Sequence, residues 1–155
     1  MVITPIVNDG RINRSKTTLN KIVAATISLL RKNNNGQIPT AQEIAVKSGV
    51  GIRTVFRHID DMEGLIEEVN RRYLNDLESY IAKNNPKQNS KDQRIEHVIK
   101  ERFYLYNTYQ HVFNLTITSL NNSSAIRTGF IKFNHILRQR FEDLIPEIKM
   151  INKDK

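Results

Sequence analysis

The sequence predicts an all-α protein, and three features of the chain support that prediction. Apolar residues recur three and four positions apart through most of its length, the spacing that places them on one face of a helix. The interruptions between these stretches are rich in Asn, Gly and Pro, which end helices and form turns. A length of 155 residues is sufficient to bury a real hydrophobic core.

Residues 1–16 are expected to form a flexible arm, because they show no helical periodicity and contain Pro5 and Gly10. The basic residues at its inner end are Arg11, Arg14 and Lys16. Such an arm either lies against nucleic-acid phosphates or in a minor groove, or is a solvated tail. The first helix is expected over residues 17–32, with Ile22, Ala25, Thr26, Leu29 and Leu30 on one face. Asn33-Asn34-Asn35-Gly36 ends it.

Residues 40–65 predict two short helices joined by a tight turn. Thr40 and Glu43 have the spacing of a capping box, so a helix is expected to start at about Ala41. Ser48-Gly49-Val50-Gly51 ends this helix, because glycine tolerates a positive φ. The apolar residues that then recur at helical spacing, and are expected to face inward, are Ile52, Val55, Phe56 and Ile59. The residues expected on the outward side are Arg53, Thr54, Arg57 and His58.

Two short helices with a glycine turn and a basic outward face describe a helix-turn-helix. The second helix of this motif lies in the DNA major groove, with its early residues at the base edges. A net charge of +8 also favours a polyanionic partner. The same pattern occurs in plain structural hairpins, so at this point both interpretations stay open.

A long helix is expected next, over residues 61–83, with carboxylates at Asp60, Asp61 and Glu63 at its positive end. Its apolar stripe is Leu65, Ile66, Val69, Tyr73, Leu77, Tyr80 and Ile81. Asn84-Asn85-Pro86 then ends it, because proline bars continuation.

Three more helices are expected after this break. The first covers residues 91–107 with Ile95, Val98, Ile99, Arg102, Phe103 and Tyr106 on one face. The second covers residues 108–121 with His111, Val112, Leu115, Thr116 and Ser119. The last begins after a cap at Ser123 or Ser124, ends near Leu144 before Pro146, and carries Ile126, Phe130, Phe133, Leu137 and Phe141.

Composition argues against several classes of protein. Cysteine is absent, which excludes disulfides, thiol nucleophiles and thiolate metal sites. No secretory signal or membrane-length apolar run is present, so a cytoplasmic location is expected, with no membrane partner. No catalytic motif appears, and an enzyme, a cofactor or a metal site is not expected. His97 and Glu101 are spaced for one helix face, but surface pairing is the favoured interpretation over metal binding.

The chain resembles the tetracycline-repressor-like (TetR) family of transcriptional regulators over roughly residues 17–70. The matching segments are residues 22–30, the Gly36 loop, residues 40–45, Ser48-Gly49-Val50, residues 54–59 and Glu63-Gly64-Leu65. The resemblance implies a three-helix DNA-binding head over residues 17–72 and a fourth helix leading into a helical ligand-binding and dimerisation body over residues 73–155. Three positions depart from the family, which usually has Ser at 51, Tyr at 56 and Lys at 62, where this chain has Gly51, Phe56 and Met62.

The resemblance also implies two sets of site residues. Those expected to contact double-stranded DNA are Thr40, Gln42, Gly51, Ile52, Arg53, Thr54, Phe56, Arg57 and His58. Those expected to hold a small-molecule effector, if they are not simply core, are Phe103, Tyr106, Tyr109, His111 and Phe133.

The expected function is therefore a ligand-responsive repressor that binds a palindromic operator as a homodimer. Family members usually carry about two further helices that form the dimer interface. Either this chain is shortened, or its last helix dimerises through Phe130, Phe133 and Phe141. A helical protein-interaction module that no longer binds DNA is the rival interpretation, which Phe56 and Met62 keep open, and a small-molecule carrier is a third.

Overall fold

The computed structural model describes residues 10–59, 62–86 and 90–148, and within these ranges the chain is all-helical. The helices are α1 (Gly10–Asn33), α2 (Ala41–Ser48), α3 (Ile52–His58), α4 (Met62–Lys83), α5 (Lys91–Ser119) and α6 (Ser124–Leu144). The prediction of an all-α fold is confirmed. None of the helices described is long and apolar enough to cross a membrane.

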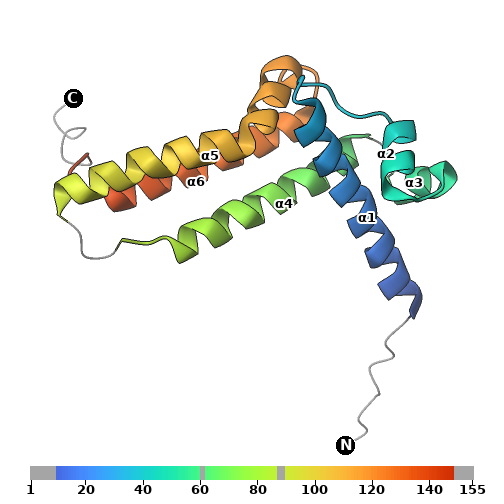
Figure 1. Ribbon diagram of the computed structural model, residues 1–155, viewed down its shortest axis with the longest axis horizontal. Coiled ribbons are helices and arrows are strands. Elements are labelled where there is room, and N and C mark those ends of the chain that lie inside the picture. The colour runs from blue at the N-terminus through green and yellow to red at the C-terminus, as the bar shows by residue number, and fades with distance from the viewer. Residues whose placement is uncertain (1–9, 60–61, 87–89, 149–155) are drawn as a thin grey trace, which may run out of the picture.

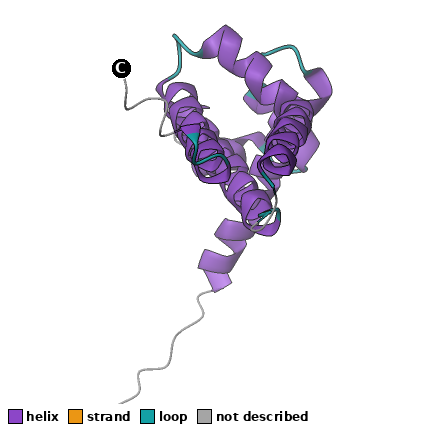
Figure 2. Ribbon diagram, turned by 90° about the vertical axis from the view of Figure 1, so that its left-hand side faces the viewer, coloured by secondary structure: helices purple, strands orange, loops and turns teal. Residues whose placement is uncertain are grey.

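The helices form two groups that share α4. α2 and α3 lie at one end of the molecule beside α1, and α4 runs from there along the long axis (Figure 1). α5 and α6 run alongside each other as a hairpin, and α6 packs against α4. Figure 2, turned so that these long helices are seen nearly end-on, shows only helices and loops in the described chain.

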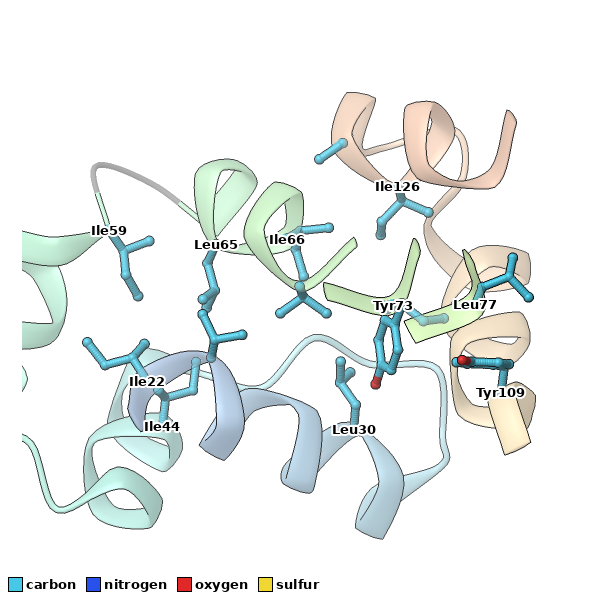
Figure 3. Packing of buried hydrophobic residues seen from close by; sticks show 14 of the residues in the cluster. Ile22, Leu30, Ile44, Ile59, Leu65, Ile66, Tyr73, Leu77, Tyr109 and Ile126 are labelled. Carbon is cyan, nitrogen blue, oxygen red and sulfur yellow. The ribbon is translucent and has the colours of Figure 1, made fainter. Parts of the chain in front are cut away.

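A single hydrophobic cluster joins the two groups, and α4 contributes to it along its length. Leu65 and Ile66, near the start of α4, pack with Ile22 of α1 and Ile44 of α2 (Figure 3). Further along α4, Tyr73 and Leu77 belong to the same cluster as Tyr109 of α5 and Ile126 of α6. Each of these fully buried side chains contributes about 1.5–3 kcal/mol of transfer free energy. The predicted apolar stripe of this helix is confirmed.

The first helix is longer than predicted. α1 begins at Gly10, so residues 10–16 of the expected arm are helical, while residues 1–9 lie outside the described residues. The hydroxyls of Thr17 and Thr18 donate to the backbone carbonyls of Asn13 and Arg14 at 2.8 and 2.9 Å. This first part of α1 is exposed and buries no apolar face, which is why a search for apolar periodicity missed it. The expected start of α4 at Asp61 also lies outside the described residues.

The two helices predicted over residues 91–121 are one helix, α5, which begins after a capping box formed by Ser90 and Gln93. It has a kink at Tyr109, where φ is −110° and ψ is 17°. The face predicted for its first half is not the face that packs on the core, because Val98 is the one residue of that set that is buried. Among the residues of that face, Ile95 and Arg102 are half-buried, and Ile99, Phe103 and Tyr106 are exposed.

A buried ion pair explains which face of α5 turns inward. Glu101 is buried, and its Oε2 lies 3.3 Å from Nε of Arg140 in α6, which is also buried. Nη1 of Arg140 also donates to Oδ1 of Asn85 at 3.2 Å. A charged residue at a core position breaks the apolar pattern, so the pattern alone selected the wrong face.

The last helix has the predicted bounds. The hydroxyl of Ser123 accepts a hydrogen bond from the backbone N–H of Ile126 at 3.1 Å, which is the expected cap. Glu63, expected to cap only its own helix, reaches this cap too, and its carboxylate accepts from the backbone N–H of Ala125 at 2.9 Å. That hydrogen bond lowers the pKa of Glu63. The start of α4 is thereby tied to the start of α6.

Candidate nucleic-acid interface

The N-terminus of α2 has the predicted capping box. The backbone N–H of Thr40 donates to Oε2 of Glu43 at 2.8 Å, and the N–H of Glu43 donates to the Thr40 hydroxyl at 3.3 Å. The hydrogen bond from the Thr40 backbone also lowers the pKa of Glu43. Thr40 and Gln42 are both exposed at this helix end, while Ile44 and Ala45 are buried and fix α2 on the core.

The turn between α2 and α3 uses both of its glycines. Gly49 ends α2 with φ of 68°, a left-handed conformation that costs a residue with a Cβ about 1–2 kcal/mol. Gly51 precedes α3, and its backbone carbonyl accepts from the N–H groups of Thr54 and Val55 at 2.8 and 3.0 Å. No side chain caps α3. The first turn of α3 is therefore approachable from solvent, and Gly51 itself is exposed.

α3 is anchored by Val55 and by Ile59, which directly follows it, both of them buried. The outward side carries the predicted polar residues, with Arg53 and Arg57 exposed and Thr54 and His58 half-buried. Ile52, which was expected to face inward, is 39% exposed, so that expectation is wrong.

The prediction that Phe56 packs inward is wrong, because its side chain is 61% exposed. Phe56 points about 100° away from Val55 around the helix axis, and α3 is seated on the core through Val55 and Ile59.

A groove with basic side chains lies where α1 and α3 meet. Its volume is about 450 Å³, and its lining residues are Arg14, Ser15 and Thr18 of α1 with Arg57 and His58 of α3. None of the described residues that line it is acidic. Arg14 was expected only as part of an arm, and its place beside Arg57 follows from the extension of α1. The groove continues the exposed basic side of α3 onto a second helix.

The five residues expected to hold an effector separate in the structure. Tyr109 and Phe133 line one small cavity between α4, α5 and α6, with ring centroids 5.8 Å apart. The cavity has a volume of about 30 Å³, room for about one water molecule. The side chains of Phe103 and Tyr106 are exposed and lie outside it.

His111 is buried but does not line the cavity. Its Nε2 lies 2.7 Å from the hydroxyl of Tyr73, which donates to it when the imidazole is neutral. Burial, together with the nearby charge of Arg31, lowers the pKa of His111 to about 4. Tyr73 and Phe113 do line the cavity or its rim and were not among the expected effector residues. They lie on different helices whose faces meet only in the folded protein, so no local sequence pattern marks them as cavity residues.

A polar contact joins the loop between α1 and α2 to the second half of α5. Nδ2 of Asn114 donates to the backbone carbonyl of Asn34 at 3.0 Å and to its side-chain oxygen at 2.9 Å. The hydroxyl of Thr118 donates to the carbonyl of Gly36, which is buried and has a φ of 72°. The loop is therefore held against the half of α5 that follows the kink at Tyr109.

Glu101 and His97, the pair weighed as a metal site, lie with Oε2 and Nε2 4.0 Å apart, and Arg140 holds the Glu101 carboxylate. Among the residues that the structure describes, no cluster of three or more metal-binding side chains occurs.

No protein-family model matches the chain, and no curated protein matches it.

Proposed function

We propose that the chain is a DNA-binding transcriptional regulator of the tetracycline-repressor type, a ligand-responsive repressor that binds a palindromic operator as a homodimer. α1, α2 and α3 form its helix-turn-helix head, and α4, α5 and α6 form the regulatory body. One observation carries the proposal: α3 is fixed by Val55 while Arg53 and Arg57 stay exposed, next to Arg14 of α1. The resemblance of residues 17–70 to that family adds to it.

In this proposal α3 enters the major groove. Arg53, in its first turn, reads a base edge, where an arginine bidentate to guanine discriminates by about 1–3 kcal/mol. Arg57 and Arg14 face the neighbouring phosphates, which give affinity without sequence information. At the exposed N-terminus of α2, Gln42 is the residue that faces a further phosphate, because the Thr40 N–H is held by the Glu43 carboxylate.

A palindromic operator requires two heads at half-sites about 34–36 Å apart. A ligand acts only if it binds differently to the two arrangements of the heads. The cavity beside Tyr109 and Phe133 has mostly apolar walls, which favours a small apolar effector that widens it. Two connections lead from it to the head, namely α4 itself and the contact of Asn114 with the Asn34 loop.

One observation favours a second candidate, a protein-interaction module. Phe56 exposes most of its ring in the middle of α3, where an aromatic side chain suits an apolar pocket of a partner protein better than a phosphate. In that case Phe56, rather than Arg53, dominates binding.

Salt dependence separates the two candidates. Fluorescence anisotropy of the full chain with labelled random duplex DNA, measured between about 50 and 200 mM salt, gives the slope of log K against log salt. A regulator with several phosphate contacts loses affinity steeply over this range. A flat response, or no binding to duplex DNA, contradicts the proposed function. Selection of bound sequences from the random pool then identifies the operator.

A further inference from the structure

α5 carries a mostly apolar seam along one side, most of which faces away from the body. The seam consists of Ile99, Phe103, Tyr106, Gln110, Phe113 and Ile117. These positions are alternately four and three residues apart, which is the heptad spacing of a helix that packs along another helix. The opposite face of α5 supplies Val98, Leu105 and Leu115 to the protein core.

Phe113 is partly buried against Phe133 of α6, but the described part of the chain leaves the other apolar residues of the seam exposed. Ile99, Phe103, Tyr106 and Ile117 are 64%, 69%, 53% and 81% exposed. Figure 1 shows α5 along the outer edge of the body, with α4 and α6 on its other side. The kink at Tyr109 does not divide the seam, because the rings of Tyr106 and Phe113 stack across it with centroids 5.7 Å apart.

The surface has the composition of an interface core. Residues 103–126 contain no Lys, Arg, Asp or Glu, although 26% of the whole chain is charged. Depletion of charge together with exposed aromatic residues distinguishes the buried centre of protein interfaces from ordinary surface. From Phe103 onward the seam offers no charge to a phosphate, whereas Ile99 lies beside the exposed Lys100–Glu96 ion pair, so the seam differs in character from the basic side of α3.

The last helix, α6, was expected from the sequence to form the dimer interface, but its aromatic side chains pack within their own chain. Phe133 of α6 contacts Tyr109 and Phe113, with ring centroids 5.8 Å apart in both pairs. Phe141 packs, partly buried, against Val98, Leu144 and Ile145. Of the three residues expected at the interface, Phe130 is the most exposed, at 37%, and it lines the small cavity. α6 therefore serves the body of its own chain.

We infer that the α5 seam is the homodimer interface and that its occupant is the same seam of a second copy. The seam positions are spaced four and three residues apart whichever end of α5 they are counted from. Two copies can therefore pair their seams about a two-fold axis, with each copy contributing the same residues. This inference rests on the proposed function in one respect, since a palindromic operator needs two copies.

The exposed area supports a dimer of modest affinity. With about 200 Å² for a large side chain, the four exposed fractions leave roughly 500 Å² of apolar surface on each copy. Two copies bury roughly 1,000 Å² before flanking residues are counted, which is the lower limit for a specific interface.

The test is the mass of the full chain by sedimentation equilibrium, without DNA, at concentrations from about 1 to 200 µM. The wild type is expected to approach twice the 18.0 kDa of one chain. Phe103→Glu and Ile117→Glu each place a carboxylate in the seam and are expected to weaken the dimer at least thirtyfold or so, the loss of an interface hot spot. Val46→Glu is the matched control, because Val46 is 75% exposed on α2, far from the seam in the chain.

Circular dichroism checks that each variant keeps the helix content of the wild type, which is expected because all three positions are exposed. A wild type that stays monomeric, or seam variants that dimerise as the wild type does, overturns the inference. A chain that dimerises through the seam but binds no duplex DNA contradicts the proposed function and leaves the assignment of the dimer interface intact. A chain that stays monomeric but binds DNA selectively contradicts the assignment of the dimer interface and leaves the proposal of DNA binding intact.

Discussion

The double variant Arg14→Ala/Arg57→Ala tests the groove between α1 and α3. Both guanidinium groups line the groove, so we expect each to neutralise one phosphate. Each phosphate contact contributes about 0.9 to the slope of log K against log salt, and two contribute about 1.8. Between 50 and 200 mM salt the wild type should then lose roughly twelvefold more affinity than the variant.

The assay is anisotropy with one duplex at several salt concentrations, with circular dichroism as a check on folding. Lys132→Ala/Arg138→Ala is the matched control, because it removes two exposed charges from α6, away from the groove. The control is expected to keep the slope of the wild type. If the double variant also keeps that slope, or if the control loses as much, the groove does not hold phosphate and the reasoning from its charge is refuted.

Two further predictions concern stability, each measured by urea unfolding. Gly36→Ala should cost at least about 2 kcal/mol, since φ is 72° and a Cβ would lie 2.6 Å from the carbonyl oxygen of Asn114. Gly49→Ala, with φ of 68° and nothing within 4 Å, should cost only about 1 kcal/mol, and equal losses would show that the loop does not press on α5. For His111, the pKa of about 4 in the fold lies below the ordinary 6.5, so the unfolded chain binds the proton more tightly. Stability is therefore full above about pH 6.5 and falls towards pH 4, by at most about 3 kcal/mol. His111→Gln should reduce this pH dependence, and an unchanged profile would contradict the assignment.

Features that depend on neighbouring residues could be predicted from the sequence. The capping box of Thr40 and Glu43 and the Ser123 cap need only a hydroxyl three residues before a free N–H. The stripe of α4 was correct because this helix is apolar on one face and polar on the other. The exposure of Arg53 and Arg57 followed from the burial of Val55 by the same argument.

Features that depend on contacts between residues distant in the chain could not be predicted from the sequence. Glu101 turns inward only because Arg140, far along the chain, reaches it, and this pair decided the face of α5. Glu63 looked like a cap for α4, yet its carboxylate also meets Ala125.

The candidate site shows the same limit. Arg14 could not be assigned to the groove, because nothing local showed that α1 extends to Gly10 and passes beside Arg57. Phe56 was misplaced because a period of three and four cannot tell which apolar residue of a seven-residue helix finds room in the core.

The base selectivity of Arg53→Ala decides whether α3 reads DNA. Affinities of wild type and variant are compared on the operator selected from random DNA and on the same duplex with each guanine of the half-site replaced in turn. At one guanine the variant should lose the discrimination that the wild type shows, roughly 5- to 150-fold, while its salt slope changes by no more than about one. A variant that still distinguishes every position as the wild type does contradicts the claim that this helix recognises sequence.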